Sequence, residues 1–238
     1  MGQARRHDSV DTKQLARFER IGHRITGDRR LGSSRGAGYE KAHVVIDDAT
    51  RLADAEVLPD EKQATTVGFL LRAVAWFDTQ GITCKRVLSD NGSAYRSKPW
   101  REACIALSLT PKRTRPYTPR TNGKAERFIK TLLAEWAYSM PFQTSGERNQ
   151  RLPRYLAIYN GRRCHMALAG RTPIQQLRLL RATEQPGGTT HLGIGMNGFD
   201  SHWLCVMPQC VFSKRREVAT DHKQGDSGNV QRHWRTSN

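Results

Sequence analysis

Residues 85–95 read KRVLSDNGSAY, and residues 112–137 read KRTRPYTPRTNGKAERFIKTLLAEWA. In the first run a short apolar pair precedes Asp90 and an Asn-Gly dipeptide follows it, which predicts a strand that ends at this carboxylate. The second run is a basic, proline-containing loop that leads into a helix with Glu126 near its start. Thirty-five residues separate the two acids. A carboxylate at a strand end and another in the first turn of a later helix can converge on one metal site.

The composition predicts one folded core and a polyanionic partner. The chain has 238 residues, of which 37% are hydrophobic, so it can bury one core of ordinary size. Its formal net charge is +17 and its pI is about 10.3. This charge exceeds what solubility requires, and it favours a polyanion as partner over a surface that is merely basic.

The sequence predicts neither a signal peptide nor a membrane span. No segment approaches the roughly 18 uninterrupted apolar residues of a transmembrane helix. The first ten residues, MGQARRHDSV, carry charges where a signal peptide has its apolar region. The five cysteines include no CxxC pair, which favours reduced thiols over a disulfide framework. We therefore expect a soluble cytoplasmic protein that makes no membrane contact.

Hydrophobic patterning predicts an α/β fold. Short apolar or β-branched runs indicate five strands, at residues 9–15, 42–46, 53–58, 82–88 and 108–112. Helical spacing of apolar residues indicates helices at 59–80, 98–107, from 122 to about 136, and 146–159. Pro153 lies either early in the last helix or at a break within it. Three strands followed by α/β crossovers imply a mixed sheet with helices on both faces.

The two acids suit phosphodiester chemistry. Such chemistry on DNA commonly uses two divalent ions, roughly 4 Å apart, that bridge the scissile phosphate. Magnesium prefers oxygen ligands and keeps several waters, so a few carboxylates on rigid elements are sufficient. A third carboxylate is expected from a neighbouring strand, and the candidates are Asp8, Asp11, Asp47 and Asp48.

These motifs carry a family resemblance. SDNG at 89–92 and TNGKAER at 121–127 resemble the catalytic core of DDE transposases and retroviral integrases. The longer run from 35 to 177, which includes YNGRRCH at 159–165, resembles bacterial transposases of the insertion-sequence 481 group. The resemblance covers about residues 8–180. It implies an RNase H-like, three-layer α/β/α fold with a mixed five-stranded sheet in residues 1–180.

The resemblance also implies a catalytic triad. The family's first aspartate lies on the first strand in a segment of the form Asp-x-Lys-x-Leu, which DTKQL at 11–15 matches. We therefore expect Asp11, Asp90 and Glu126 to be the catalytic residues and to bind two Mg²⁺ or Mn²⁺ ions. Asp8 and Asp47 are the alternatives to Asp11.

Basic residues around the second motif are candidate DNA contacts. Positive charge next to an aromatic ring suits a nucleic-acid backbone and an unstacked base, although a solvated loop has the same composition. The two lysines near Glu126 suit DNA phosphates or pairing with Glu126 along the helix. The predicted DNA-binding residues are Arg113, Arg115, Tyr117, Arg120, Lys124 and Lys130.

A second family segment follows the core helix. Tyr159, Asn160, Arg163 and His165 match a recurring pattern in which proline normally precedes the histidine, whereas this chain has Cys164. We expect a structural role for this segment. The alternative is that His165 takes part in catalysis.

The two ends of the chain depart from the family. Full-length relatives carry an N-terminal helix-turn-helix region, whereas this chain starts ten residues before Asp11, so we expect an N-terminally truncated core. The segment ARRHDSV is more polar than the usual first strand, and burying it is costly unless its polar groups are paired. Residues 181–238 lack a sustained period, and we expect a poorly ordered tail. Its candidate zinc ligands fit no compact zinc pattern: His202, Cys205, Cys210 and His222.

Three functions follow from the resemblance. The first is a metal-dependent DNA strand transferase that cleaves element ends and joins them to a target, acting as a homo-oligomer on DNA in the bacterial cytoplasm and associated with the nucleoid. The second is a catalytically inactive remnant that binds DNA nonspecifically through its charge. The third is an RNase H-like nuclease of another lineage.

Overall fold

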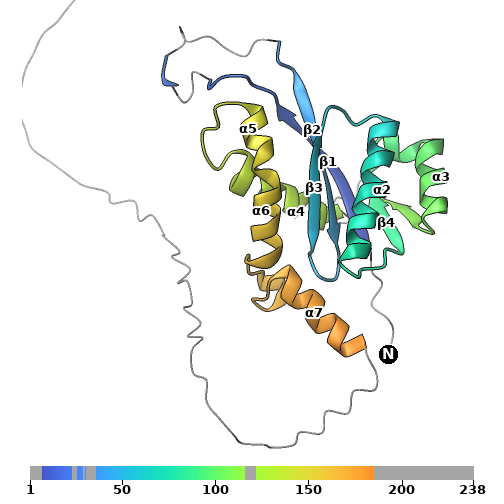
Figure 1. The fold of residues 1–238 in the computed structure, drawn as a ribbon. Coiled ribbons are helices and arrows are strands. Elements are labelled where there is room, and N and C mark those ends of the chain that lie inside the picture. The colour runs from blue at the N-terminus through green and yellow to red at the C-terminus, as the bar shows by residue number, and fades with distance from the viewer. Residues whose placement is uncertain (1–6, 23–25, 29, 31–35, 116–121, 185–238) are drawn as a thin grey trace, which may run out of the picture. The chain divides into compact units, whose positions relative to one another are not determined.

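A five-stranded mixed sheet forms the centre of the chain, and the computed structural model describes residues 7–22, 26–28, 30, 36–115 and 122–184 (Figure 1). The sheet order is β3-β2-β1-β4-β5. The β1–β2 and β2–β3 pairs are antiparallel, whereas β1–β4 and β4–β5 are parallel. The strands are β1 (Asp8–Ala16), β2 (Tyr39–Asp47), β3 (Ala53–Leu58), β4 (Arg86–Ser89) and β5 (Thr110–Arg113).

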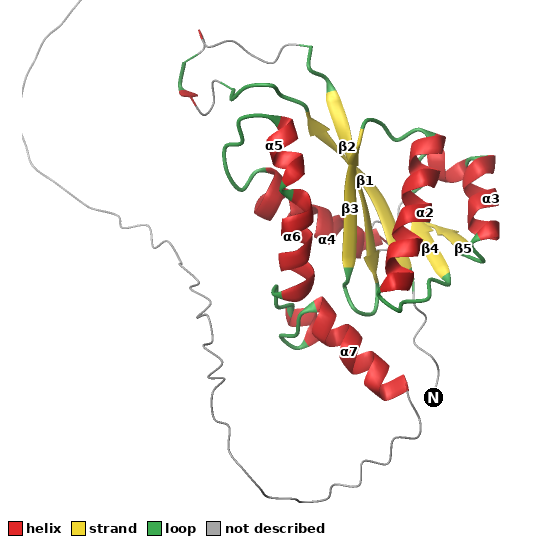
Figure 2. Ribbon diagram, in the orientation of Figure 1, coloured by secondary structure: helices red, strands yellow, loops and turns green. Residues whose placement is uncertain are grey.

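Helices cover both faces of this sheet, as the patterning predicted (Figure 2). One core joins the sheet to α4 and α6, and the other joins it to α2 and α3. The helices are α2 (Gln63–Thr79), α3 (Lys98–Ala106), α4 (Gly123–Leu132), α5 (Ser145–Gln150), α6 (Leu152–Gly161) and α7 (Pro173–Glu184). A π-helical turn, Leu133–Ala137, extends α4, and short 3₁₀ turns occupy Ala94–Arg96 and Met166–Leu168. No helix among the described residues is both long and apolar enough to cross a bilayer.

Several predicted boundaries were wrong. The helix predicted from residue 59 begins at Gln63, because the Asp60 carboxylate accepts hydrogen bonds from the Lys62 N–H and the Thr65 hydroxyl ahead of the first turn. The helix predicted at 146–159 is two helices, and Pro153 lies in the first turn of the second, where its missing N–H costs little. The sequence pattern did not predict α7.

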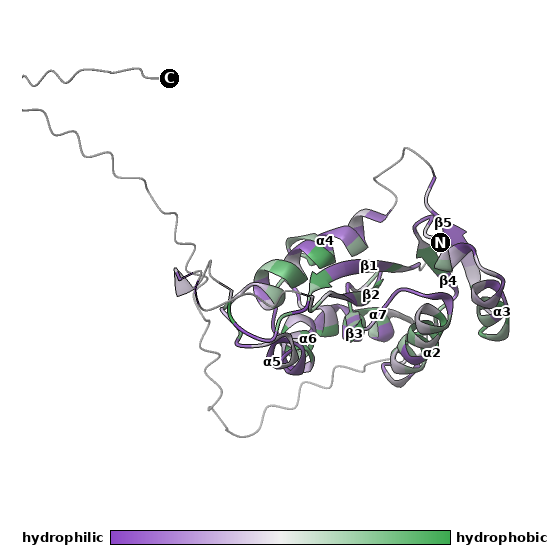
Figure 3. Cartoon of the chain, turned by 90° about the horizontal axis from the view of Figure 1, so that it is seen from above, coloured by the Kyte–Doolittle hydropathy of each residue, from purple (hydrophilic) through white to green (hydrophobic). Residues whose placement is uncertain are grey.

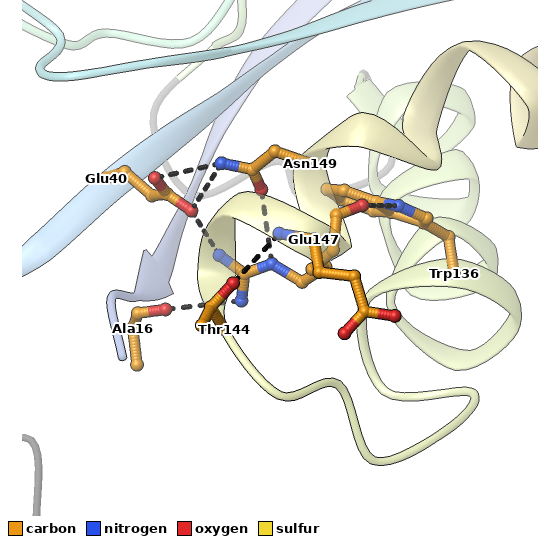
Figure 4. Close-up of polar contacts among 7 residues, drawn as sticks. Ala16, Glu40, Trp136, Thr144, Glu147 and Asn149 are labelled. Atoms are coloured by element: carbon orange, nitrogen blue, oxygen red, sulfur yellow. Dashed lines mark hydrogen bonds and ion pairs between the residues drawn. The ribbon is translucent and has the colours of Figure 1, made fainter. Parts of the chain in front are cut away.

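An ion-pair network anchors the end of β1 to α5 (Figure 4). The fully buried Arg148 side chain forms an ion pair with the Glu40 carboxylate of β2 and donates from Nη1 to the Ala16 carbonyl oxygen at 3.2 Å. The Trp136 indole donates to the Arg148 carbonyl oxygen at 2.8 Å. These bonds fix α5 and the Trp136 side chain against β1 and β2, at the end of β1 that follows Asp11.

Candidate active site

Asp11 and Asp90 both lie just beyond the paired residues of two parallel strands, Asp11 within β1 and Asp90 directly after β4. The β1–β4 pairing runs from Asp8 opposite Val87 to Ser9 opposite Leu88. Asp11 lies two residues beyond Ser9, and Asp90 lies two residues beyond Leu88. Because the strands run in the same direction, the two acids follow the last paired residues side by side.

The strand alternation turns Asp11 toward α4. Asp11 is opposite Val44 of β2, which packs in the core beneath α4, whereas its neighbour Val10 packs in the core beneath α2. Successive side chains of a strand point to opposite faces. Asp11 therefore shares the face on which α4 begins, and Asp8, three residues earlier, shares the α2 face with Val10.

Hydrogen bonds hold the Asp11 carboxylate from two sides. The Thr12 N–H donates to Oδ1 at 2.7 Å, and the Asn122 amide donates to Oδ2 at 3.3 Å. The same amide donates to the Val10 carbonyl oxygen at 3.4 Å. The buried Asn122 side chain makes no capping bond to α4 and instead ties the start of α4 to β1.

A tight turn fixes Asp90. The Gly92 N–H donates to its Oδ1 at 2.9 Å, and a Cβ atom at Gly92 would lie 3.0 Å from that oxygen. The Asn91 amide donates to the Thr114 carbonyl oxygen at 3.0 Å, which ties the turn to the residue after β5. The Asn-Gly dipeptide thus positions the carboxylate with its backbone, and the glycine leaves the space for it.

Glu126 comes to the site from the first turn of α4. Its neighbours Ala125 and Phe128 are buried in the core, which fixes the helix, while Glu126 itself is exposed. Lys130 lies one turn later on the same side of the helix and is exposed. Within the described residues Lys130 and Glu126 form no ion pair, so the predicted pairing along the helix is not observed.

The three carboxylates influence one another electrostatically. The pKa of Asp11 is raised to about 6, first by burial and then by the negative charges of Asp90 and Glu126, against the Thr12 N–H bond that lowers it. A cation between these groups would relieve the repulsion. Among the described residues, however, no three His, Cys, Asp or Glu side chains are already arranged as a metal-binding group. The acids therefore interact without forming a finished coordination shell.

The alternative aspartates have other partners. Asp47 is buried in the β2–β3 turn and accepts hydrogen bonds from the Thr50 N–H and hydroxyl. Asp48 forms ion pairs with Arg51 and with Lys124. Lys124, which we expected at DNA phosphates or beside Glu126, is therefore paired with Asp48.

The remaining predicted DNA contacts are exposed or fall outside the described residues. Arg113 ends the edge strand β5, whose side chains are all exposed, and Arg115 is exposed just after it. The hydropathy colouring shows the hydrophilic character of β5 (Figure 3). Tyr117 and Arg120 lie outside the described residues. The DNA-binding assignments stay predictions.

The YNGRRCH segment makes the kind of contacts that a structural role requires. The buried Asn160 side chain exchanges two hydrogen bonds with the Ala53 backbone, at 2.8 and 3.0 Å. The Tyr159 ring packs edge-on against Phe128 and His165 at centroid distances of 4.8 and 5.1 Å. Arg163 forms an ion pair with Glu135. These contacts join β3, α4 and α6.

Sequence reasoning missed two contacts that support the candidate triad. One is the Asn122–Asp11 hydrogen bond described above. The other joins the Tyr95 hydroxyl to the Thr12 hydroxyl at 3.1 Å and links the turn after Asp90 to the strand of Asp11. Both partners of each contact lie far apart in the chain, so no local spacing could have indicated the pairing.

Comparisons with known proteins agree with this fold. Two family profiles, both described as integrase core domain, match residues 19–119 and 107–173. The putative transposase InsD for insertion element IS2E of Escherichia coli strain K12 is 36% identical over 91 residues, which are 38% of this chain and 42% of that protein. The transposase InsD for insertion element IS2A/D/F/H/I/K of Escherichia coli is also 36% identical, over 38% of this chain and 30% of its own length. The chain thus spans less than half the length of these relatives.

Solved retroviral structures share the architecture. The HTLV-2 integrase catalytic core domain in complex with magnesium matches with a TM-score of 0.50 and 16% identity, over 72% of this chain and 94% of that one. The BIV integrase catalytic core domain matches with a TM-score of 0.50 and 19% identity, over 74% and 96%. The predicted RNase H-like architecture is confirmed. The curated relatives come from insertion element IS2, not from the insertion-sequence 481 group.

Proposed function

From the integrase core domain that residues 19–173 carry, we propose that this protein is a transposase-type DNA strand transferase. It cleaves a phosphodiester at an element end and joins the resulting 3′ end to target DNA. The observation that carries the proposal is the raised pKa of Asp11, which burial raises most and to which the negative charges of Asp90 and Glu126 add. Like charges that lie close together beside a partly buried carboxylate are unfavourable unless a cation binds there.

The donor set fits a hard divalent cation. Three carboxylates from β1, the β4 end and α4 supply only oxygen ligands, which Mg²⁺ and Mn²⁺ prefer. Asp11, Asp90 and Glu126 would hold two such ions. When bound, the ions polarise the scissile phosphate and help to activate the attacking water or hydroxyl. The HTLV-2 integrase catalytic core domain, which shares this fold, was solved in complex with magnesium.

The chain's own residues prepare this site. The Thr12 N–H and the Asn122 amide orient the Asp11 carboxylate, and the Gly92 N–H orients that of Asp90. Because the pKa of Asp11 is about 6, this acid loses its proton only near neutral pH, so cation binding is favoured there. We propose that Arg113 and Arg115 contact DNA phosphates, because both are exposed and flank Thr114, which is hydrogen-bonded to the Asp90 turn.

The finer assignments belong to this proposal. We expect the element ends and the target to be double-stranded DNA, the protein to act as a homo-oligomer on DNA, and the protein to associate with the bacterial nucleoid. Membership of the insertion-sequence 481 group rests on the motif resemblance alone.

A second candidate function is a catalytically inactive remnant that binds DNA through its charge. The observation in its favour is that no described group of three ligating side chains is already arranged to hold a metal. The net charge of +17 is sufficient for nonspecific binding.

One experiment separates the two candidates. The purified chain is incubated with supercoiled plasmid and about 10 mM Mg²⁺ or Mn²⁺, and nicking and strand joining are followed on gels. We expect weak activity that Asp90→Asn and Glu126→Gln each abolish while leaving DNA binding intact. The matched control is Asp54→Asn, which replaces a half-buried carboxylate on β3. Cleavage that persists unchanged in the Asp90 and Glu126 variants would refute the triad, and binding without any cleavage would favour the inactive remnant.

A further inference from the structure

A basic cavity lies on the side of α4 next to the candidate triad. It has a volume of about 570 Å³ and is lined from the β2–β3 turn, α4, α6 and the segment after α6. We call it the α4 cavity. Among the described residues that line it there is no carboxylate. Its cationic lining residues are Arg51, Lys124, Arg127 and Arg163, and its other titratable lining residues are Tyr159, Cys164 and His165.

The helical spacing separates this cavity from the triad. Lys124, Arg127 and Thr131 recur every three or four residues and form one stripe of α4, and all three line the α4 cavity. Glu126 and Lys130 form the neighbouring stripe. The cavity and the triad are therefore on adjacent faces of the first turns of one helix, and an extended ligand crossing α4 can reach both.

Positive charge in the cavity exceeds the negative charge beside it. Asp48 pairs with both Arg51 and Lys124, and Glu135 pairs with Arg163. Asp47 also acts electrostatically on Arg51 and Lys124, so three nearby acids face four cations. Within the described part of the chain, Arg127 has no acidic partner, and its side chain is exposed. An excess of positive charge remains for an anionic ligand.

The paired cations are held in fixed orientations. Glu135 accepts from Nε of Arg163 at 3.0 and 3.1 Å and forms an ion pair with Nη2 at 2.9 Å, which leaves other guanidinium N–H groups free to donate. The Arg163 guanidinium also lies 5.8 Å from the centre of the Tyr159 ring. A guanidinium that is already oriented loses less entropy when it binds a phosphate.

His165 adds a polar atom that no described group satisfies. Its Nε2 is buried and has no hydrogen-bond partner among the described residues. The pKa of His165 is lowered by burial and by the nearby charges of Arg163 and Arg51. A bound anion would supply an acceptor and offset this repulsion.

We propose that the α4 cavity is a phosphate-binding subsite that holds the DNA backbone next to the cleaved position. The inference rests on the proposed function for the identity of the polynucleotide, but the binding itself needs no metal. Arginine forks from separate elements suit the several oxygens of a phosphodiester. A strand whose phosphate lies in the cavity crosses the first turns of α4, where Glu126 lies on the adjacent stripe.

The test measures binding without catalysis. The full chain is titrated in EDTA against a fluorescein-labelled duplex over a series of salt concentrations. For Arg127→Gln we expect an affinity about tenfold lower and a log K against log salt slope smaller by about one. Thr131→Glu, which places a carboxylate in the cavity without removing a cation, should weaken binding at least as much. The matched control is Arg101→Gln, because Arg101 is also exposed but lies on α3 at the other face of the sheet.

The outcomes are distinguishable. If both cavity variants fold, as circular dichroism reports, and bind DNA like Arg101→Gln, the subsite is wrong even when the chain cleaves DNA. If the variants lose binding while the chain never cleaves DNA, the strand-transfer proposal fails and the subsite stands. A further titration distinguishes DNA phosphate from free phosphate as the ligand. Inorganic pyrophosphate is added to the protein, and the NMR resonances of the His165 imidazole are followed. If it shifts those resonances while Arg127→Gln binds DNA normally, the cavity takes a free phosphate and the DNA inference is overturned.

Discussion

Replacing Asp11 with asparagine should stabilise the protein at pH 8, even though it removes a residue that we place in the active site. The pKa of Asp11 is raised from 3.8 to about 6, mainly by burial and next by the charges of Asp90 and Glu126. The ionised form is therefore less stable in the folded protein than in the unfolded chain. An asparagine side chain would keep the shape of the aspartate and remove the charge.

Proton binding determines whether the stability of the folded state rises or falls with pH. Between pH 3.8 and 6 the folded state holds a proton on Asp11 that the unfolded state has already lost, so stability falls as the pH rises through this window. Below this window both states are protonated and the penalty vanishes. The pKa difference corresponds to about 3 kcal/mol. Because Asp11 is partly exposed, solvent screening reduces the expected penalty to about 1–2 kcal/mol above pH 7.

Urea unfolding of the wild type and Asp11→Asn in EDTA, at pH 4 and pH 8, measures this difference. Any hydrogen bond that the substitution weakens affects both pH values, so the change in the free energy of unfolding between them isolates the charge. Asp54→Asn is the matched control, since burial also raises the pKa of Asp54 to about 6. It should gain stability at pH 8 in the same way.

The response to Mg²⁺ distinguishes Asp11 from Asp54. If Asp11 is a metal ligand, about 10 mM Mg²⁺ should stabilise the wild type and Asp54→Asn but not Asp11→Asn, because a ligand that binds only the folded state raises its stability. An equal loss of stability for Asp11→Asn at both pH values would refute the electrostatic reasoning. A Mg²⁺ response that survives in Asp11→Asn would refute its place in the metal site.

Two further predictions concern the scaffold. Arg148→Met should lower the free energy of unfolding by about 3–5 kcal/mol in urea titrations, since it leaves the buried Glu40 carboxylate without its cation. Adding Glu40→Gln to this variant should restore part of the lost stability. A double variant no more stable than Arg148→Met would contradict this account. Gly92→Ala should change stability by less than about 1 kcal/mol but sharply reduce cleavage, because its Cβ would lie 3.0 Å from Asp90 Oδ1. Full cleavage by Gly92→Ala would show that the turn need not hold the carboxylate as we describe.

The parts of the fold that the sequence predicted well are those set by local patterns. The predicted strand at 53–58 is found at the same residues, and the predicted helix at 98–107 differs by one residue at its end. In both, apolar spacing and turn residues agree with the tertiary structure. The break at Pro153 is also local: the sequence offered it as one of two alternatives, and the structure shows that it is the right one.

The central strand shows why the rest could not be predicted. The sequence indicated a weak strand at 9–15, because its residues are mostly polar, yet β1 is the central strand and Asp8 and Ser9 are 5% and 3% exposed. Polar groups there are tolerated because distant parts of the chain satisfy them. Asp8 interacts with Cys84, whose pKa is raised by burial and by this contact, and the Ala16 carbonyl oxygen accepts from Arg148.

The same reasoning applies to the candidate site. Asp90 and Glu126 were predictable because each is attached to a local signal, a turn dipeptide and a helix start. The environment of Asp11 was not, because it depends on Asn122, which follows it by 111 residues. Lys124 was predicted to contact DNA phosphates or to pair with Glu126, but it forms a longer-range ion pair with Asp48. Local rules thus identified the acids, whereas long-range contacts decide which of them are held together and which cations remain available for DNA.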